Sequence, residues 1–361
     1  MVSSAAIKQH AAELGFDLCG VAPAHAFPEL AFLKEWLAKG YAGEMQYMYN
    51  SAERRADIRN FLPSAKSVIV TATVYNTAEP REPRAGNREP EVRDAIQVAR
   101  YARGQDYHKV LGERLHALRE WMRHQSDEAF DAEIFVDKHH VQERVFAQYA
   151  GLGWIGKNTC LINRDQGSWL FLAGMATSLE LESDHPAFDQ CGACTLCIDA
   201  CPTGALVDAR VMDATKCISY LTIEVDGPIP EAQRAQIGNH AYGCDICQDV
   251  CPWNLAAPAS DDPAWQAPQR DGLPASELWR RSDFDLHQLV KGSAMTYLPL
   301  SRFRRNLAIV IGNTGDPELT DVLDRPGDGV RNAARSAATP VVEDAVRGAR
   351  DILSRPRERS S

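Results

Sequence analysis

The chain of 361 residues contains no long hydrophobic run and no segment built like an export signal. Its first eight residues lack the apolar stretch that a secretory signal needs, and Arg54-Arg55 lies too far along the chain for a twin-arginine signal. The most apolar stretch, around 169–172, is far shorter than a membrane span. We therefore expect a cytoplasmic protein that does not use a membrane.

Two further sequence features argue against nucleotide binding through a P-loop and against general nucleic-acid binding. The glycine-dense segment 151–159 ends in Lys157-Asn158-Thr159 but lacks the Gly-x4-Gly-Lys-Ser/Thr spacing of a P-loop, so nucleotide binding of that kind is not expected. The formal net charge of −10 argues against a general nucleic-acid coat, because phosphates repel an acidic surface. From residue 302 onward the chain is slightly basic, which still permits a local contact with phosphates.

Cysteine is the residue type that is unusually placed. Seven of the ten cysteines lie in two runs, C-x2-C-x2-C-x3-C-P at 191–202 and C-x2-C-x3-C-P at 244–252, and one more lies between them. This spacing is typical of two [4Fe–4S] clusters, because the fourth cysteine of a run ligates the other cluster. The pattern predicts two ligand sets: Cys191, Cys194, Cys197 and Cys251 for one cluster, and Cys201, Cys217, Cys244 and Cys247 for the other.

Disulfides or structural zinc would account for these closely spaced cysteines less well. Disulfides are typical of small secreted domains, and this chain is long and without a secretory signal. Structural zinc accepts C-x2-C pairs but gives no reason for two C-x3-C-P endings. Cys19 and Cys160 fall in apolar stretches, so we expect them to be buried core thiols rather than ligands.

The first half of the chain alternates helical and extended patterns. A helix capped by Ser3 or Ser4, a strand over 16–21 and a helix over 29–39 precede a continuous β-branched strand over 66–75. Apolar positions between 110 and 122 form one helix face, and 133–137 reads as a strand followed by a helix to residue 150. Residues 159–162 and 168–173 suggest a hairpin, and 79–92 an exposed loop. We expect an α/β or α+β domain around a sheet.

The second half divides into two parts. The cluster segment, about 189–254, has the brevity of a ferredoxin. After it, an R-N-x-A pattern at 305–308 returns at 331–334, which indicates stacked helical pairs of a short solenoid. We therefore predict an α/β domain over 1–185, a ferredoxin-like domain over 186–258 and a helical domain over 259–361.

Asp137 is the leading candidate for acid chemistry. It ends a buried-looking strand, where desolvation can raise the pKa of a carboxyl and make it a general acid. The alternatives are a helix N-cap or an ion pair with Arg144. The glycines of 151–156 either let the backbone approach a flat ligand or form a structural turn.

Histidine gives weaker signals. His108 lies in a near copy of the Asp-x-His-x-x-Gly signature of cobalamin-binding mutases, with one residue too many before the glycine. We expect it to be a surface or capping histidine rather than a cobalt ligand. His139 and His140 follow Asp137 without a third matching ligand, so a metal site is not expected there.

Taken together, these motifs resemble the epoxyqueuosine reductase family, iron–sulfur and cobalamin enzymes of tRNA queuosine biosynthesis. Apart from the first cluster motif, the matching segments are RYARGQDYH at 100–108, GLGWIGKNT at 151–159, CISYLTIE at 217–224 and YGCDICQDVCPWN at 242–254. The end of the chain is similar to the HEAT-like end of that family. The resemblance covers about residues 5–345.

The resemblance implies a base-off cobalamin between the N-terminal and cluster domains, with Asp137 as proton donor. The cofactor contacts that it implies are Arg55, Asp137, Lys157, Ser168, Ser219 and Asp245. Two departures from the family pattern stand out. Lys138-His139-His140 replaces the usual continuation after the aspartate, and Thr296-Tyr297 stands where relatives often carry arginines.

The implied reaction reduces epoxyqueuosine in a tRNA anticodon loop to queuosine, with electrons passed through the clusters to cobalamin. Arg302, Arg304 and Arg305 are expected to hold tRNA phosphates, and a monomer served by an external electron donor is expected. Competing functions are a reductive dehalogenase-like enzyme with the same cofactors, or a ferredoxin-type electron-transfer module. The large N-terminal domain disfavours the module, because an electron carrier needs only the cluster segment.

Overall fold

The computed structural model describes residues 2–77, 93–266, 270–324 and 339–355. The predicted loop 79–92 and the second R-N-x-A copy at 331–334 lie outside the described residues. Within the described ranges, no helix combines the length and apolarity that crossing a bilayer demands.

A four-stranded antiparallel sheet forms the centre of the N-terminal part. Its order is β1 (Leu18–Pro23), β2 (Ser67–Val74), β7 (Leu170–Thr177) and β4 (Ala132–Phe135), and each neighbouring pair is antiparallel. All eight residues of β2 are buried, as its continuous β-branched run predicts. The α/β expectation is therefore wrong for this sheet, and the alternative α+β expectation is confirmed, because periodicity along one strand does not reveal its partner's direction.

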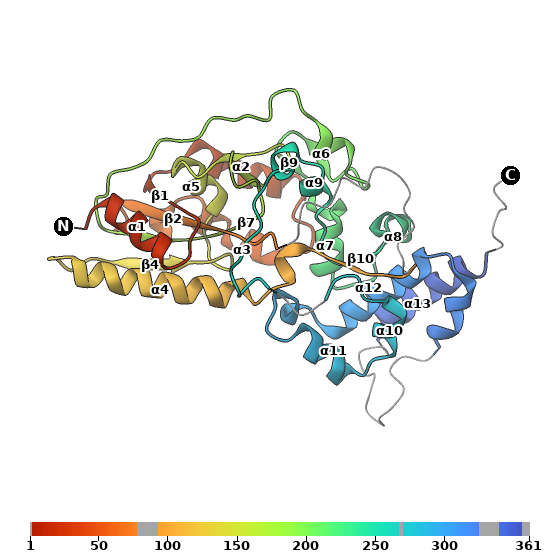
Figure 1. Ribbon diagram of the computed structural model, residues 1–361. Helices are drawn as coiled ribbons and strands as arrows, with labels where there is room; N and C mark the ends of the chain where they lie inside the picture. Colours follow the sequence, from red (N-terminus) through yellow and green to blue (C-terminus); the bar gives the residue numbers. More distant parts are fainter. Residues whose placement is uncertain (1, 78–92, 267–269, 325–338, 356–361) are drawn as a thin grey trace.

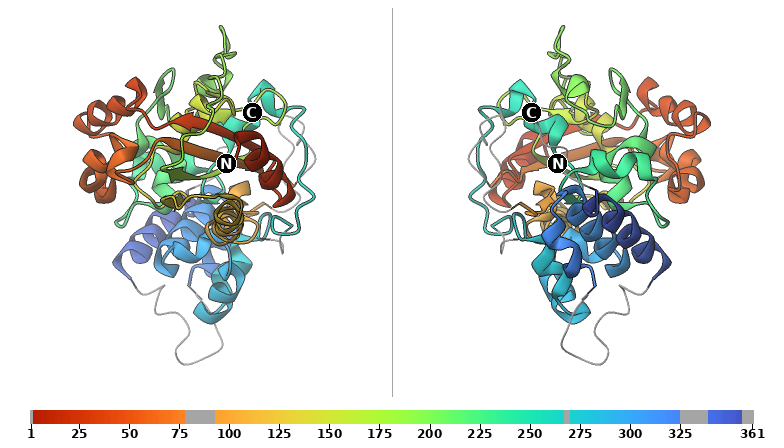
Figure 2. Two further views of the ribbon diagram at one scale, coloured as in Figure 1. Left: turned by 90° about the vertical axis from the view of Figure 1, so that its left-hand side faces the viewer. Right: turned by 90° about the vertical axis from the view of Figure 1, so that its right-hand side faces the viewer.

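Helices cover both faces of this sheet (Figures 1 and 2). On one face α1 (Ser4–Glu13), capped by Ser3, and α4 (Tyr107–Gln125) bury their apolar stripes against β2 and β7. On the other face lie α5 (Glu143–Tyr149) and α2 (Pro28–Ala38), next to α3 (Gln46–Arg55). Amphipathic helices of this kind are stabilised mainly by burying one face.

The predicted hairpin of 159–162 with 168–173 is wrong. β6 (Leu161–Ile162) pairs instead with β5 (Trp154–Ile155), while β7 lies between β2 and β4 in the central sheet. An isolated bridge between Asn163 and Gly167 is the remnant of that hairpin. Pairing of β7 with β2 and β4 buries more apolar surface than a local hairpin with 159–162 would, and this burial decides the pairing.

Short elements make up the cluster segment. They are α6 (Leu196–Asp199), β8 (Leu206–Asp208), β9 (Val211–Met212), α7 (Ile218–Ile223), α8 (Glu231–Ile237), β10 (His240–Tyr242) and α9 (Ile246–Asp249). The 3₁₀ helices in the described part of the chain are η1 (Ile58–Asn60), η2 (Arg100–Ala102), η3 (Ala214–Lys216), η4 (Pro252–Asn254), η5 (Ala294–Tyr297) and η6 (Pro317–Val322). β10 pairs in parallel with β3 (Gln97–Val98), so the cluster segment is joined to the first half of the chain.

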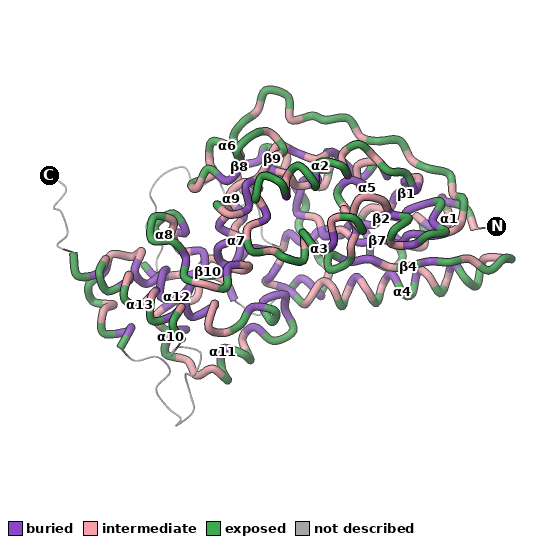
Figure 3. The backbone as a smooth tube through the Cα atoms, turned by 180° about the vertical axis from the view of Figure 1, so that it is seen from behind, coloured by how far each residue is buried: buried purple, intermediate pink, exposed green. Residues whose placement is uncertain are grey.

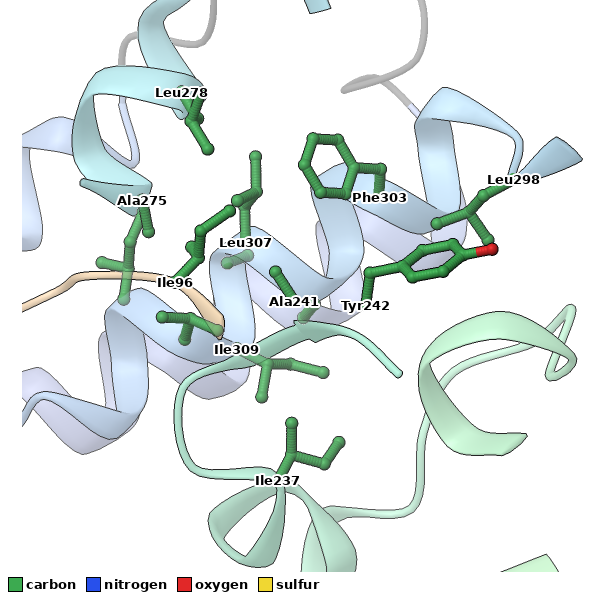
Figure 4. Packing of buried hydrophobic residues seen from close by; sticks show 14 of the residues in the cluster. Ile96, Ile237, Ala241, Tyr242, Ala275, Leu278, Leu298, Phe303, Leu307 and Ile309 are labelled. Carbon is green, nitrogen blue, oxygen red and sulfur yellow. The ribbon is translucent and has the colours of Figure 1, made fainter. Parts of the chain in front are cut away.

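The C-terminal part is helical, with α10 (Ala275–Arg280), α11 (Asp283–Val290), α12 (Leu300–Asn313) and α13 (Pro340–Leu353). Ten consecutive residues of α12, 303–312, are buried (Figure 3). Phe303 and Leu307 meet Ile96 and Tyr242 in one core (Figure 4). Residues 96–102, assigned to the first domain from sequence, thus pack with the cluster segment and the helices, and these parts of the chain share one hydrophobic core.

Candidate active site and cluster region

Asp137 lies on a tight turn just after β4. Its φ of 51° is left-handed, a conformation that aspartate tolerates better than most residues, and the Lys138 N–H donates to the Val136 carbonyl at 2.5 Å. The Asp137 side chain is 60% exposed. The N-cap alternative is wrong, because Gln142 occupies that position before α5. Arg144 donates to the Thr159 carbonyl at 2.6 Å and acts on Asp137 only through its charge.

The first turn of α4 supplies the partners of Asp137. The Tyr107 hydroxyl donates to Asp137 Oδ2 at 2.7 Å, and His108 Nε2 lies 3.2 Å from the same oxygen. Asp106 caps α4 and lies 2.7 Å from His108 Nδ1. His108 is therefore near a helix start, as expected, but it also bridges two carboxylates. Sequence reasoning missed this role; the nearest signal was the D-Y-H triplet inside the motif at 100–108.

Opposing effects act on the pKa of Asp137. Burial among protein groups raises it, but the hydrogen bonds from His108 and Tyr107 and the charges of His108 and Arg144 lower it, and together they win. The pKa therefore lies below its usual value, the opposite of the expectation from sequence. Burial and the nearby Asp137 charge raise the pKa of Tyr107 strongly, so Tyr107 remains a neutral donor.

Glu143, at the start of α5, is a second carboxyl close to Asp137. Its Oε1 is buried and has no hydrogen-bond partner in the part of the chain that the structure describes. Burial, and secondarily the charge of Asp137, raises the pKa of Glu143 to about 8, although Arg55 and Arg144 act in the other direction. Sequence reasoning did not single out this residue. A protonated, partly unsatisfied carboxyl is a group that a ligand could pair with.

Tyrosines from several elements lie within electrostatic range of Asp137. The charge of Asp137 acts on Tyr101 from η2, Tyr47 from α3 and Tyr242 from β10, and for each of them burial is the main cause of a raised pKa. The Glu224 carboxyl, just after α7, also feels this charge. The sheet and the cluster segment therefore meet at Asp137, the aspartate that the sequence singled out.

The eight cysteines separate into two neighbourhoods. Electrostatic contacts join Cys197 with Cys191 and Cys194, and Cys251 with Cys191 and Cys197. In the second group, Cys217 lies near Cys201, and Cys244 lies near both Cys201 and Cys217. Cys247 joins this group through its electrostatic contacts with Cys217 and Cys244. These groups coincide with the two ligand sets derived from spacing. Cys160 hydrogen-bonds Cys247, so it packs against the second group rather than in an apolar core.

Backbone amides surround several of these thiols. Cys217 precedes α7 and accepts hydrogen bonds from the amides of Ser219 and Tyr220, and the Ala205 amide donates to Cys201 Sγ at 3.3 Å. Such donors stabilise thiolates and tune cluster potentials. Within the described ranges, no three His, Cys, Asp or Glu side chains converge on one point closely enough for a single metal ion. A four-iron cubane is larger than one ion and keeps its thiolates further apart.

The contacts expected for cobalamin are spread over this region. Arg55, half-buried on α3, donates to Val141 O at 3.0 Å, and Lys157 donates to the carbonyls of Gly192 and Cys194. The remaining three lie on the cluster side. Ser168 is buried in a network with Gln248 and Asn254, Ser219 is half-buried on α7, and Asp245 is buried and accepts from the Arg100 amide.

Two of the three predicted phosphate-binding arginines are buried, so that expectation is wrong for them. Arg304 is 0% exposed and donates to Trp279 O, Arg281 O and Asp283. Arg305 is also 0% exposed; Leu221, Val225 and Gly227 supply carbonyl acceptors for it. Arg302 reaches the surface partly, with an 18% exposed side chain that pairs with Asp226.

Comparison with known proteins agrees with this arrangement. A family model for a 4Fe-4S double cluster binding domain matches residues 190–254, and a model for epoxyqueuosine reductase QueG matches residues 55–138. An epoxyqueuosine reductase of Gloeobacter violaceus is 42% identical over 322 residues, which cover 87% of this chain and 97% of the relative. The two-cluster expectation is thus confirmed for the cysteine-rich segment.

Solved structures give the same result. An epoxyqueuosine reductase bound to an epoxyqueuosine-modified tRNA-Tyr stem loop matches with a TM-score of 0.76 at 26% identity, over 96% of this chain and 97% of the other. The Bacillus subtilis enzyme, solved with the loop of its catalytic aspartate swung out of the active site, matches with a TM-score of 0.72 at 25% identity, over 96% and 97%. The chain therefore belongs to the epoxyqueuosine reductase family of oxidoreductases.

Proposed function

We propose that this chain reduces epoxyqueuosine in the anticodon loop of a tRNA to queuosine, with Asp137 as the proton donor. The observation that carries the proposal is the position of Asp137, which accepts a hydrogen bond from Tyr107 and lies within electrostatic range of Tyr101 and of Tyr242 from the cluster segment. The solved relative with an epoxyqueuosine-modified stem loop supports tRNA as the substrate.

Two [4Fe–4S] clusters deliver the electrons in this proposal. The neighbourhoods of the thiols support Cys191, Cys194, Cys197 and Cys251 as one ligand set and Cys201, Cys217, Cys244 and Cys247 as the other. An external donor, which the reaction requires, reduces them one electron at a time. Opening the epoxide to an alkene consumes two electrons and two protons and releases one water.

Cobalamin fits the residues around Asp137. The unpartnered Oε1 of Glu143 offers a hydrogen-bond site to an amide of the corrin rim, and Arg55 lies beside it. Arg55, Lys157, Ser168, Ser219 and Asp245 remain the contacts that the resemblance implies. When bound, the cofactor would supply a cobalt that takes up electrons singly and, once reduced, is nucleophilic toward carbon.

Asp137 is the proton donor in the proposed reaction. Its carboxyl is water-accessible and ordinarily ionised in this structure, because Tyr107 and His108 stabilise the charge. Arrival of a bulky nucleoside excludes water, which raises the cost of that charge and favours protonation. His108, held between Asp106 and Asp137, is placed to pass a proton to the carboxylate. Asp137 then protonates the epoxide oxygen as the ring opens.

A recess beside Asp106 is the surface that we assign to tRNA phosphates in place of Arg304 and Arg305. Two exposed lysines and one carboxylate line it, together with amide and glycine groups and the buried Arg270, whose guanidinium donates to backbone carbonyls: Gln105, Asp106, Lys109, Gln266, Arg270, Lys291 and Gly292. Lys109 and Lys291 are exposed and can approach phosphates without desolvation. Arg302, which is partly exposed, stays a candidate at the edge of the helical part.

The test uses anaerobically reconstituted protein and an epoxyqueuosine-containing stem loop. Asp137→Ala is expected to retain about eight irons and bound cobalamin but to lose turnover by at least about a hundredfold, as expected for removal of a general acid. Asp165→Asn, an exposed aspartate, serves as the matched control and is expected to be fully active. Unchanged turnover in Asp137→Ala would refute the acid assignment, and absence of queuosine from wild-type reactions would refute the function.

A further inference from the structure

Lys138 and Tyr297 join the Asp137 turn to the helical part of the molecule. The Lys138 ammonium lies 3.4 Å from the centroid of the Tyr297 ring, close enough for a cation–π interaction. The two residues are far apart in the sequence, and both belong to the segments that depart from the family pattern. The two segments that differ from the family pattern are thus in contact with each other.

Tyr297 also reaches the hydrogen-bond chain behind Asp137. Its hydroxyl donates to Asp106 Oδ2 at 2.7 Å, and its ring meets the His108 ring edge-on at 5.5 Å. Asp106 uses its other oxygen to hold His108, which faces Asp137. Tyr297 therefore contacts Lys138, which follows Asp137 in the sequence, and Asp106, which holds His108 in place.

The base of Tyr297 is rigid. It ends η5, where Ala294 and Met295 are buried and the Tyr242 hydroxyl donates to the Ala294 carbonyl at 3.2 Å. The Asp106 amide donates to the Gly292 carbonyl at 2.8 Å, so the start of α4 is tied to the same segment. The Asp137 turn, in contrast, is exposed and has a left-handed residue at its centre. An exposed turn is thus contacted by a ring whose backbone is packed and hydrogen-bonded to the rest of the molecule.

We propose that Lys138 and Tyr297 form a latch that holds the Asp137 turn in its inward position, with both acting as positioning residues for the proton donor. This inference rests on the proposed role of Asp137. In the Bacillus subtilis structure the catalytic loop is swung out of the active site, which supports a loop that can move. The latch stabilises the inward position through the ring and through Asp106, and its release lets product leave.

The variants separate the two contacts of the ring. Lys138→Met removes the cation at nearly constant volume, and Lys138→Arg restores it. Tyr297→Leu removes both contacts, whereas Tyr297→Phe keeps the ring and loses only the bond to Asp106. Phe284→Leu, an exposed aromatic residue on α11, is the matched control for loss of an aromatic surface.

The first measurement is hydrogen exchange of residues 136–142 on the millisecond-to-minute scale, in protein with its clusters but without substrate. Lys138→Met and Tyr297→Leu are expected to speed exchange about three- to tenfold. The double variant is expected to exchange no faster than Tyr297→Leu, because Tyr297→Leu already removes the ring that Lys138 contacts. Lys138→Arg and Phe284→Leu are expected to match the wild type. Unchanged exchange in both single variants, or effects that multiply in the double variant, would overturn the latch.

The second measurement is steady-state turnover of the stem loop. A positioning role predicts a lower kcat by about the same factor with KM unchanged, and recovery in Lys138→Arg. A rise in KM alone, with kcat unchanged, would assign the pair to substrate binding and overturn the proposal. Because the exchange measurement needs no turnover, failure of the latch and failure of the proposed reaction give different results.

Discussion

The Tyr107 hydroxyl donates its hydrogen bond to the same Asp137 oxygen that faces His108 Nε2, at 2.7 and 3.2 Å. One carboxylate oxygen is thereby occupied by two groups from the first turn of α4. In the proposed reaction, the other oxygen faces the substrate. The two contacts keep the pKa of Asp137 low and fix the direction of its free oxygen. If Asp137 is the proton donor that we propose, it is thus oriented before substrate arrives.

Removal of the Tyr107 hydroxyl tests this arrangement. Tyr107→Phe takes away a hydrogen bond to the ionised carboxyl, so the pKa of Asp137 is expected to rise. An acid that must be protonated stays competent up to its pKa in the substrate complex, so the alkaline limb of the kcat profile should move to higher pH. Tyr41→Phe, a tyrosine that stacks with Lys39 outside this site, is the control. A limb that stays in place would show that Asp137 does not set it.

Cys217 tests the ligand sets. Cys217→Ser is expected to lower bound iron from about eight to about four per chain, because only the cluster with Cys201, Cys244 and Cys247 loses a thiolate. Cys19→Ser, which changes a half-buried thiol in the N-terminal core, should keep about eight. Iron analysis with electron paramagnetic resonance of the reduced protein checks both. Full iron content in Cys217→Ser would remove this residue from the set.

Arg305 tests the correction to the phosphate-binding arginines. Arg305→Leu leaves the carbonyls of Leu221, Val225 and Gly227 without their donor, which is expected to lower the free energy of unfolding by about 3 kcal/mol or more. Arg347→Gln, on the surface of α13, should change it by less than about 0.5 kcal/mol.

Filter binding of a tRNA stem loop to the folded Arg305→Leu protein completes the test. The buried guanidinium reaches no solvent, so affinity and its salt dependence are expected to equal those of the wild type. Weaker binding at unchanged stability would restore the original expectation of a phosphate contact.

Local sequence patterns predicted the parts of the molecule that depend on neighbours in the chain. The buried strand at 66–75, the helix face at 110–122 and the grouping of the cysteines into two neighbourhoods follow from local patterns alone, because each is encoded within short segments. The two cluster ligand sets stay a prediction. Comparison with relatives then confirmed the double-cluster segment. These features needed no knowledge of distant contacts.

Distant contacts account for what sequence reasoning missed. The partners of Arg305 lie about eighty positions earlier in the chain, so a helical arginine that looks solvent-exposed is buried by carbonyls that no local pattern reveals. In the same way, His108 and Asp137 are in contact although 29 positions separate them in the sequence. β7 pairs with β2 and β4 rather than with the preceding segment 159–162. The direction of the Asp137 pKa shift depends on those contacts and could not be read from the strand that precedes it.

Glu143 gives a pH signature that no other assignment in this site predicts. Its pKa of about 8 in the folded protein lies above the value of 4.5 for an unperturbed glutamate, so between these values the folded state binds more protons than the unfolded state. Its contribution to stability is therefore complete below pH 4.5 and is lost as the pH rises toward 8. Glu143→Gln cannot ionise and escapes this loss.

We therefore expect the free energy of unfolding of Glu143→Gln, relative to that of the wild type, to rise by about 2 kcal/mol between pH 5 and pH 8. This is less than the whole pKa shift implies, because water reaches the neighbouring Asp137. Anaerobic chemical denaturation at equal cluster content measures the difference, with Glu133→Gln, an exposed residue of β4, as control. Parallel pH dependence in Glu143→Gln and the wild type would contradict burial of an uncompensated carboxyl. A loss of the difference when cobalamin is added would instead place Glu143 against the cofactor, since a new hydrogen-bond donor satisfies Oε1.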